Sequence, residues 1–427
     1  MRLGNGMWHA IACVGLAPLL LLIAAGGALA QGAPSEIRIG TLYAASGNYA
    51  AISMPVYSGL RFWIDQKNAE GGVFVKAFSK KIPIHLISYD DQSNTATAAT
   101  LYNQLITQDK VDILISDSGS VLTSVAVPIA RDHKMLLWDI TGSSPNFFSA
   151  DNPYIVLLAL AATDRYPKSI ADFVAEMPKL GIKNVAILYN TADYTAFQAT
   201  AVRKAVEANP NLKLVFDRGV PANTTDYTLL VNNVEASQPD ALLEFGYPAN
   251  EIAFLRALQD NGSKFKFLFT GYGLTEMSLM QTNGVADQLM NTYALAAAAS
   301  YARKPQVGLD LPHLREAFEK WVEDHHQTGV EFGFNALAGY QAGLVIENAL
   351  AEANSLDQLE LRRAVFTLSG KLVTLDGPFI LAPDGSQSGE ILPLGQIMPG
   401  KNGAKDYSIN IVWPPELATA KPLYPAP

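Results

Sequence analysis

Short apolar runs alternate with longer segments in which apolar residues recur every three or four positions, from residue 37 onward. The runs predict buried strands, and the longer spacing predicts amphipathic helices. The first strands are expected at 37–43, 82–89, 111–115 and 135–138. The first helix is expected to open at Pro55, because proline fits the first turn of a helix. This alternation predicts an α/β fold in which helices cover both faces of a parallel sheet.

The same pattern restarts near residue 170, which predicts a second lobe. A helix is expected at 170–180, and further strands are expected at 185–189, 212–216, 241–245 and 265–269. After residue 300, three helices follow with little strand between them, at 311–325, 336–353 and 356–367. Helices without strands of their own must pack on an existing sheet. We therefore expect two doubly wound parallel-sheet lobes joined by three crossover strands: lobe 1 from 31–157 and 296–370, lobe 2 from 158–295 and 371–427.

The first 30 residues differ from the rest. Arg2 precedes an almost wholly apolar stretch from Ala10 to Ala25, and Ala28-Leu29-Ala30 forms a small-residue site before Gln31. This pattern predicts a secretory signal peptide over residues 1–30, cleaved after Ala30, and a secreted mature protein. The alternative is an uncleaved membrane anchor. No other segment reaches the roughly 18 apolar residues that a membrane helix needs.

Composition limits the classes of partner. The chain has 427 residues, which suits two or three domains of about 100–200 residues each. Its formal net charge of −9 disfavours binding to nucleic acid or anionic lipid. The single cysteine, Cys13, lies in the leader, so the mature chain is expected to have no disulfide and no thiol chemistry.

Two hydroxyl-rich turns follow neighbouring predicted strands. They read Ser-Asp-Ser-Gly-Ser at 116–120 and Thr-Gly-Ser-Ser-Pro at 141–145. In a parallel sheet such loops emerge at one edge, where open α/β sheets bind ligands. Free N–H groups at a helix start, with hydroxyl donors beside them, suit an anion such as a carboxylate. The alternative is that a serine of the first turn only caps the next helix.

Tyrosines follow three predicted strands of the second lobe, at Tyr194, Tyr247 and Tyr272. A tyrosine in this position can offer a ring face to a ligand and a hydroxyl to a polar group. We therefore expect these three residues to line a ligand site.

Other polar residues are interpreted as structural. Asp90 and Asp91 are expected to order their loop, and Asp117 is expected either to face solvent or to pair with a donor. The adjacent His325 and His326 do not share a helix face, which disfavours a metal site. No nucleotide-binding loop or nucleophile elbow appears. We expect no metal, no cofactor and no catalytic residue.

The ordered set of short motifs resembles the periplasmic substrate-binding proteins of ABC transporters, of the branched-chain amino acid (leucine/isoleucine/valine-binding) type. The matching stretches are S-G-x-x-A at 46–50, Y-D-D at 89–91, A-V-P at 126–128, V-A-I-L-Y-N-T-A-D-Y at 185–194 and D-G-P-F at 376–379, with the turns at 116–120 and 142–145. The resemblance covers residues 36–400. It implies a type I periplasmic binding fold, whose two lobes close on a small ligand. It also implies a location in the periplasm and an ABC permease in the inner membrane as partner. A monomer is expected.

The resemblance also implies roles for individual residues. The carboxylate contacts fall on Gly119, Ser120, Thr141, Gly142 and Ser143, and the aromatic contacts on Tyr194 and Tyr247. Amino-acid binders of this type place an acidic residue for the ligand's ammonium group where this chain has Tyr272; Asp193 or Glu276 would have to substitute. An aromatic acid is therefore favoured over a neutral amino acid. The alternatives are a ligand-sensing module for a receptor or regulator, and a secreted hydrolase that uses Ser120.

Overall fold

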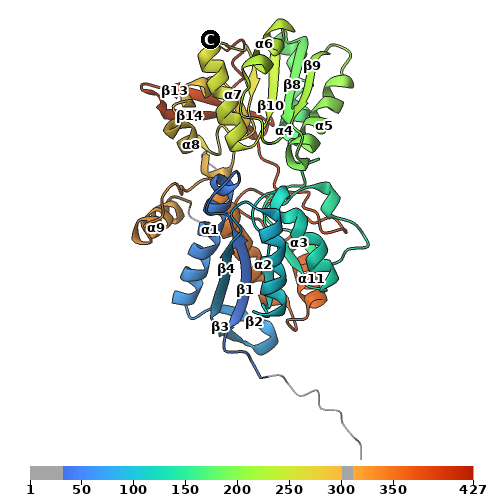
Figure 1. Ribbon diagram of the computed structural model, residues 1–427, viewed down its shortest axis with the longest axis vertical. Coiled ribbons are helices and arrows are strands. Elements are labelled where there is room, and N and C mark those ends of the chain that lie inside the picture. Colours follow the sequence, from blue (N-terminus) through green and yellow to red (C-terminus); the bar gives the residue numbers. More distant parts are fainter. Residues whose placement is uncertain (1–31, 301–310, 427) are drawn as a thin grey trace, which may run out of the picture. The chain divides into compact units, whose positions relative to one another are not determined.

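Two separate β-sheets organise the chain (Figure 1). The computed structural model describes residues 32–300 and 311–426, so the expected leader lies outside the described residues. The first sheet has the order β4-β1-β5-β6-β7, and every neighbouring pair in it is parallel. Its strands are β1 (Ile37–Tyr43), β4 (Ile84–Asp90), β5 (Ile113–Ile115), β6 (Leu137–Asp139) and β7 (Ile155–Leu157).

The second sheet has the order β14-β13-β12-β11-β10-β8-β9. It is parallel from β9 to β12, and β13 and β14 extend it as an antiparallel edge. Its strands are β8 (Asn184–Asn190), β9 (Lys213–Val220), β10 (Ala241–Phe245), β11 (Leu268–Phe269), β12 (Tyr293–Leu295), β13 (Leu394–Gly400) and β14 (Gly403–Trp413). The two mainly parallel sheets confirm the expected α/β fold class.

Successive strand residues face opposite sides of each sheet, so each sheet has a hydrophobic core on both faces. In the first sheet, Ile113 and Ile115 belong to one core and Leu114 to the other. In the second sheet, Leu243 and Leu242 divide in the same way. Burial on both faces explains why these strands read as continuous apolar runs.

Helices supply the other half of each core (Figure 1). Those that pack on the first sheet are α1 (Ala50–Ala69), α2 (Thr95–Thr107), α3 (Ser120–Asp132), α9 (Leu311–Asp324), α10 (Phe334–Glu352) and α11 (Gln358–Leu368). Those that pack on the second sheet are α4 (Lys168–Phe173), α5 (Asp193–Glu207), α6 (Thr228–Ala236), α7 (Pro248–Asn261) and α8 (Met277–Thr282). Among the described residues, no helix has the length and apolar character needed to span a bilayer.

Several expected boundaries are wrong for local reasons. Helix α1 begins at Ala50, not at Pro55, because the Tyr49 carbonyl already accepts from the N–H groups of Ile52 and Ser53. The helix expected at 170–180 is divided into α4 and η3 (Met177–Leu180), and Pro178, which has no N–H to donate, lies in the second piece.

Several short elements were not expected from the sequence. These are the hairpin of β2 (Val73–Val75) and β3 (Lys80–Ile82), the strands β7 and β12, and the 3-10 turns η1 (Lys76–Phe78), η2 (Pro145–Phe147), η4 (Ala286–Leu289) and η5 (Ala298–Ser300).

The helices after residue 310 pack on the first sheet, as the sequence suggested: Phe318, Leu337 and Leu361 lie in its core. Phe379 and Leu381 lie in the same core, although lobe 2 was expected from residue 371 onward. Backbone hydrogen bonds explain this difference, because the Leu157 N–H donates to the Gly385 carbonyl at 2.9 Å. The segment 371–387 therefore packs with the first sheet, and the lobe boundaries remain predictions.

Candidate functional site

Each sheet has a point at which its strand order reverses direction, and open α/β sheets bind ligands at such points. In the first sheet β4 and β5 flank β1, so the reversal lies between the loops that follow β1 and β5. In the second sheet β9 and β10 flank β8, so it lies between the loops that follow β8 and β10. Residues from both places line one small cavity: Ile52, Ser118, Gly119, Thr141, Leu160, Tyr194, Tyr247, Tyr272, Phe334 and Asn335.

The polar side of this cavity comes from the first sheet. The Thr141 hydroxyl oxygen accepts from the Gly119 N–H at 2.9 Å and lies 2.9 Å from the Ser118 hydroxyl. If Ser118 donates to Thr141, the Thr141 proton remains free to donate elsewhere. Gly119 has a φ of 83°, in the left-handed region that residues with a Cβ rarely adopt, so a side chain there would strain the loop. Hydroxyl and N–H groups thus meet at one place without a charged partner.

Ser120, Gly142 and Ser143 were also expected to contact a carboxylate, but they do not line the cavity. The Ser120 hydroxyl oxygen accepts from the Ser144 N–H at 3.2 Å, which ties the two turns together. Gly142 packs against Thr123 so closely that an added Cβ would lie 2.4 Å from the threonine oxygen. Ser143 is fully buried, and its hydroxyl has no hydrogen-bond partner among the described residues. The capping interpretation is wrong for Ser120, since Gly119 is the N-cap of α3 and makes no side-chain cap bond.

Buried carboxyl groups fix these turns by accepting hydrogen bonds from them. Asp139 accepts from the Gly142 N–H at 2.7 Å and from the Ser116 hydroxyl at 2.8 Å. Asp117 accepts from the Ser53 hydroxyl at 2.5 Å and from the Ser118 N–H at 2.6 Å. Asp117 is therefore not solvent-facing, because its donor is Ser53 at the start of α1. Burial raises the pKa of Asp117 well above its ordinary value.

The loop role expected for Asp90 and Asp91 is confirmed. Asp90 accepts from the N–H groups of Gln92 and Ala45 at 2.9 and 3.0 Å, and Asp91 accepts from the Ser93 N–H at 2.9 Å. These bonds close the turn that follows β4 and join it to the loop that follows β1.

Asp139 makes the stability of this edge depend on pH. Burial raises its pKa to about 7, although the hydrogen bonds from Ser116 and Gly142 oppose the shift. Because the pKa is higher in the folded than in the unfolded chain, the folded state prefers the protonated, uncharged Asp139. The stability that Asp139 contributes is therefore complete below about pH 4 and is lost as the pH rises towards 7. We expect Asp139→Asn to gain stability relative to the wild type over this range, by at least about 1.4 kcal/mol, the equivalent of one pKa unit. Urea unfolding of both proteins from pH 4 to pH 8 measures it, with the exposed Asp132→Asn as control. Parallel pH profiles for wild type and Asp139→Asn would contradict the assignment.

The aromatic side of the cavity comes from the second sheet. Tyr194, Tyr247 and Tyr272 are brought together, with ring centroids 5.6, 5.9 and 6.2 Å apart. Burial raises the pKa of all three phenols, so they are neutral at pH 7. The Tyr247 hydroxyl is buried and has no hydrogen-bond partner among the described residues. The space left in the cavity is about 10 Å³, room for about one water molecule, so any ligand needs these rings to move apart.

The two candidate substitutes for an ammonium-binding carboxylate are engaged elsewhere. Asp193 accepts from the Ser144 hydroxyl at 2.7 Å and from the Asn146 amide at 2.9 Å. Glu276 accepts from the amide of Asn335, and burial raises its pKa well above the ordinary value. Neither residue lines the cavity. Both contacts instead join a segment that packs with the first sheet to one that packs with the second.

Residues missed by the sequence analysis complete the site. Phe334 and Asn335 come from the first turn of α10, Ile52 from α1 and Leu160 from the segment after β7. Glu251 on α7 was also missed; its carboxylate accepts from the Tyr272 N–H at 2.7 Å and so positions the loop that carries Tyr272. In the sequence, Phe334 and Ile52 look like ordinary core residues of a helix, so nothing there pointed to a ligand site.

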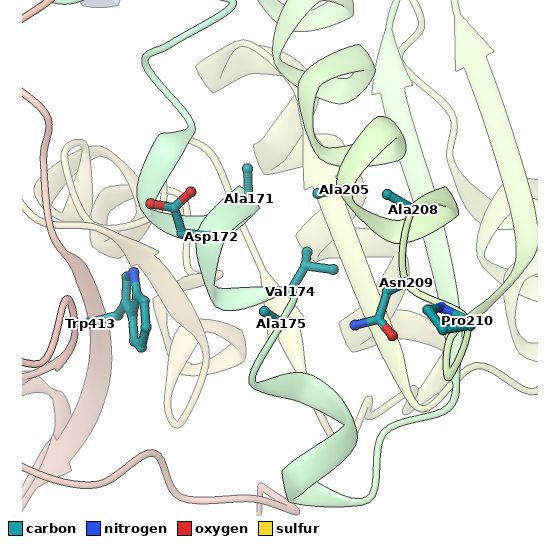
Figure 2. Close-up of a pocket in the computed structure, with 9 residues that line it drawn as sticks. All are labelled: Ala171, Asp172, Val174, Ala175, Ala205, Ala208, Asn209, Pro210 and Trp413. Carbon is teal, nitrogen blue, oxygen red and sulfur yellow. The ribbon is translucent and has the colours of Figure 1, made fainter.

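A larger hollow of about 640 Å³ lies between α4, the end of α5 and Trp413 (Figure 2). Alanines form much of its lining, and its carboxylate, Asp172, pairs with Lys168 at 2.6 Å. None of the residues expected to bind a ligand lines it. Its size alone therefore does not make it the candidate site.

Comparisons with known proteins identify a family and relatives for this chain. The model of a family described as "Periplasmic binding protein" matches residues 36–396. Leu/Ile/Val-binding protein homolog 7 of Brucella melitensis is 23% identical over 376 residues, which cover 81% of this chain and 85% of that protein. The leucine-specific-binding protein of Salmonella typhimurium is 24% identical over 242 residues, which cover 56% of this chain and 63% of that protein.

Solved structures show the same fold. A periplasmic binding protein type 1 from Bordetella pertussis matches with a TM-score of 0.73 and 15% identity, over 88% of this chain and 100% of that one. A branched-chain amino acid transporter substrate-binding protein from Streptococcus pneumoniae, in complex with isoleucine, gives 0.71 and 19%, over 88% and 99%. A solute-binding protein from R. palustris, in complex with benzoate, gives 0.69 and 17%, over 86% and 94%. These likenesses confirm the expected type I fold.

Proposed function

The chain belongs to the periplasmic binding protein family, and on this premise we propose that it captures a small carboxylate in the cavity between the two sheets and delivers it to an ABC permease. The family is one of solute-binding proteins, and membership implies an extracytoplasmic location. The observation that carries the ligand class is the meeting of neutral donors with an aromatic wall. The Thr141 and Ser118 hydroxyls, with the Gly119 N–H that donates to Thr141, lie in the same cavity as Tyr194, Tyr247 and Tyr272.

Neutral donors suit a carboxylate that arrives already ionised. A hydrogen bond from the Thr141 hydroxyl to a charged group contributes about 1.5–3 kcal/mol, and the rest of a micromolar affinity comes from burial of the ligand's body against the tyrosines. No lysine, arginine, aspartate or glutamate lines the cavity among the described residues. The ligand therefore keeps one charge at the donor end and presents an uncharged body to the tyrosines.

An aromatic acid fits this division better than an amino acid does. Three flat rings of neutral tyrosines suit an apolar or aromatic body. Fold relatives bind isoleucine, benzoate and 4-hydroxybenzoate according to their descriptions, and these ligands share a carboxylate. The absence of a lining carboxylate from the described cavity separates this site from one built for an ammonium group.

Closure would couple binding to a change in shape. The bonds from Ser144 and Asn146 to Asp193, and from Asn335 to Glu276, join the segments on either side of the cavity. Opening must break these bonds to admit a ligand, and closing restores them around it. The closed form would be the one that the permease recognises.

A thermal-shift screen tests the proposal. Benzoate, 4-hydroxybenzoate, 3-phenylpropanoate, phenylalanine, leucine and aliphatic acids are compared at a concentration of 1 mM. A ligand at 100 times its dissociation constant stabilises the folded chain by about 2.7 kcal/mol, which is a measurable rise in Tm. We expect a rise with at least one aromatic acid. No rise with any of the carboxylates, or ester hydrolysis abolished in Ser120→Ala, would reject the proposal.

The exported protein is expected to begin at Gln31. The small-residue site at 28–30 follows an apolar core, and the family is extracytoplasmic. N-terminal sequencing of the protein from a periplasmic extract measures this directly. Recovery of the chain from membranes with residues 1–30 attached would contradict it.

A further inference from the structure

A second cavity lies against the candidate site. It has a volume of about 130 Å³ and lies between the loop that precedes α1 and the loop at 222–225. The start of α7 forms its third wall. A cavity of about 150 Å³ holds a benzene molecule, so this one has room for a group of several heavy atoms. The central cavity, at about 10 Å³, has far less space.

The two cavities share a wall. Tyr247 lines both of them, and the ring of Tyr49 meets the Tyr247 ring edge-on with centroids 5.5 Å apart. Tyr247 is 3% exposed, and its hydroxyl has no partner among the described residues. This aromatic pair is therefore the partition that a long ligand would have to pass, and Tyr247 carries an unused polar group at that place.

The chemistry of the second cavity is polar but uncharged. Its side-chain amides come from Asn48 and Asn223, which are exposed, and from Asn250. The Asn250 amide is already used, since it donates to the carbonyls of Ala222 and Thr224 at 2.9 and 3.0 Å and so fixes the loop. Thr224 and Thr225 add hydroxyls, and no charged side chain lines the cavity.

We propose that this second cavity is a subsite for the far end of the ligand, and that it takes an uncharged group that both donates and accepts hydrogen bonds, such as a hydroxyl or a carboxamide. The inference rests on the proposed function, because the carboxylate must occupy the donors of the first sheet. It narrows the substrate class to carboxylates that carry a neutral polar group beyond an apolar or aromatic body. A second charge is disfavoured, because no opposite charge in the cavity compensates for its desolvation.

Isothermal titration with a matched series tests the subsite. The probes are 3-phenylpropanoates that carry at ring position 4 a hydrogen, a methyl, a hydroxyl, a carboxamide or a carboxylate. We expect the hydroxyl and carboxamide compounds to bind about 3–10-fold more tightly than the methyl compound, in line with one or two neutral hydrogen bonds. The carboxylate compound should bind more weakly than the methyl compound.

Variants place the effect in the second cavity. Asn48→Ala combined with Asn223→Ala should bring the hydroxyl-to-methyl ratio close to one, and a ratio measured within one protein is insensitive to a general loss of affinity. The exposed Asn211→Ala serves as the control and should keep the wild-type ratio. Equal affinities across the series, or a ratio that survives in the double variant, would overturn the subsite while leaving the proposed function intact. Binding of none of these acids, together with no rise in Tm for any carboxylate of the thermal-shift screen, would overturn the proposed function and the subsite with it.

Discussion

An acid that lacks an ammonium group should bind this protein at least about 100-fold more tightly than the amino acid with the same side chain. Tyr272 lines the cavity at the position where the resemblance to amino-acid binders leads us to expect an acidic residue. Asp193 is held by Ser144 and Asn146, and Glu276 by Asn335. An ammonium group desolvated without an acidic partner costs several kcal/mol, and 100-fold corresponds to about 2.7 kcal/mol.

Titration with 3-phenylpropanoate and phenylalanine measures this preference. Tyr272→Glu should reduce it about tenfold or more, because it introduces a carboxylate into the cavity. Tyr272→Gln is the matched control, since it adds a polar side chain of the same length without charge. Tighter binding of phenylalanine by the wild type, lost in Asp193→Asn or Glu276→Gln, would contradict the preference and restore amino-acid specificity.

Thr141→Val should weaken binding of the acid about 10–100-fold. It should also lower the stability of the free protein by about 1–3 kcal/mol, because the buried Gly119 N–H and Ser118 hydroxyl lose their partner. Valine keeps the shape of threonine and removes the hydroxyl that lies between Gly119 and Ser118. Loss of a hydrogen bond to a charged ligand accounts for about 1.5–3 kcal/mol. Calorimetry gives the affinity, and thermal unfolding without ligand gives the stability.

Two controls separate binding from folding in this experiment. Thr100→Val makes the same exchange on the exposed side of α2 and should leave affinity unchanged. Ser120→Ala should cost less affinity than Thr141→Val, because Ser120 does not line the cavity and accepts from Ser144 instead. The same small loss in all three variants would mean that the first-sheet turns do not hold the ligand.

Much of the fold could be predicted from the sequence, because a strand that is buried on both faces of its sheet appears as a continuous apolar run. The runs at 185–189 and 241–245 match β8 and β10 closely, since every second residue faces a hydrophobic core and the others face another. The missed strands β2, β3, β7 and β12 are three residues long. The strands β5 and β6 are equally short, but they lie within or overlap the longer apolar runs at 111–115 and 135–138, which made them visible. Pro55 does not mark the start of α1, because the Tyr49 carbonyl accepts the first helical hydrogen bonds several residues earlier.

The lining of the candidate cavity was predicted only in part, because some of its contacts join residues that are far apart in the sequence. The end of a buried strand is visible in the sequence as a polar turn, and this signal pointed to Gly119, Thr141 and the three tyrosines. These five residues line one cavity in the structure. Ser120, Gly142 and Ser143 looked equivalent in sequence, but only the packed structure shows that they support the turns. The burial of Asp117 depends on Ser53, 64 residues away, which no local pattern reveals. Phe334 and Asn335 read as ordinary helix residues for the same reason.

The central claim is that the first-sheet donors hold a carboxylate. Titration of 3-phenylpropanoate and of its primary amide into the mature chain tests it most directly, because the two compounds share shape and apolar body and differ in charge. We predict micromolar binding of the acid and at least about 100-fold weaker binding of the amide. Equal affinity for the two, or tighter binding of the amide, would contradict the claim.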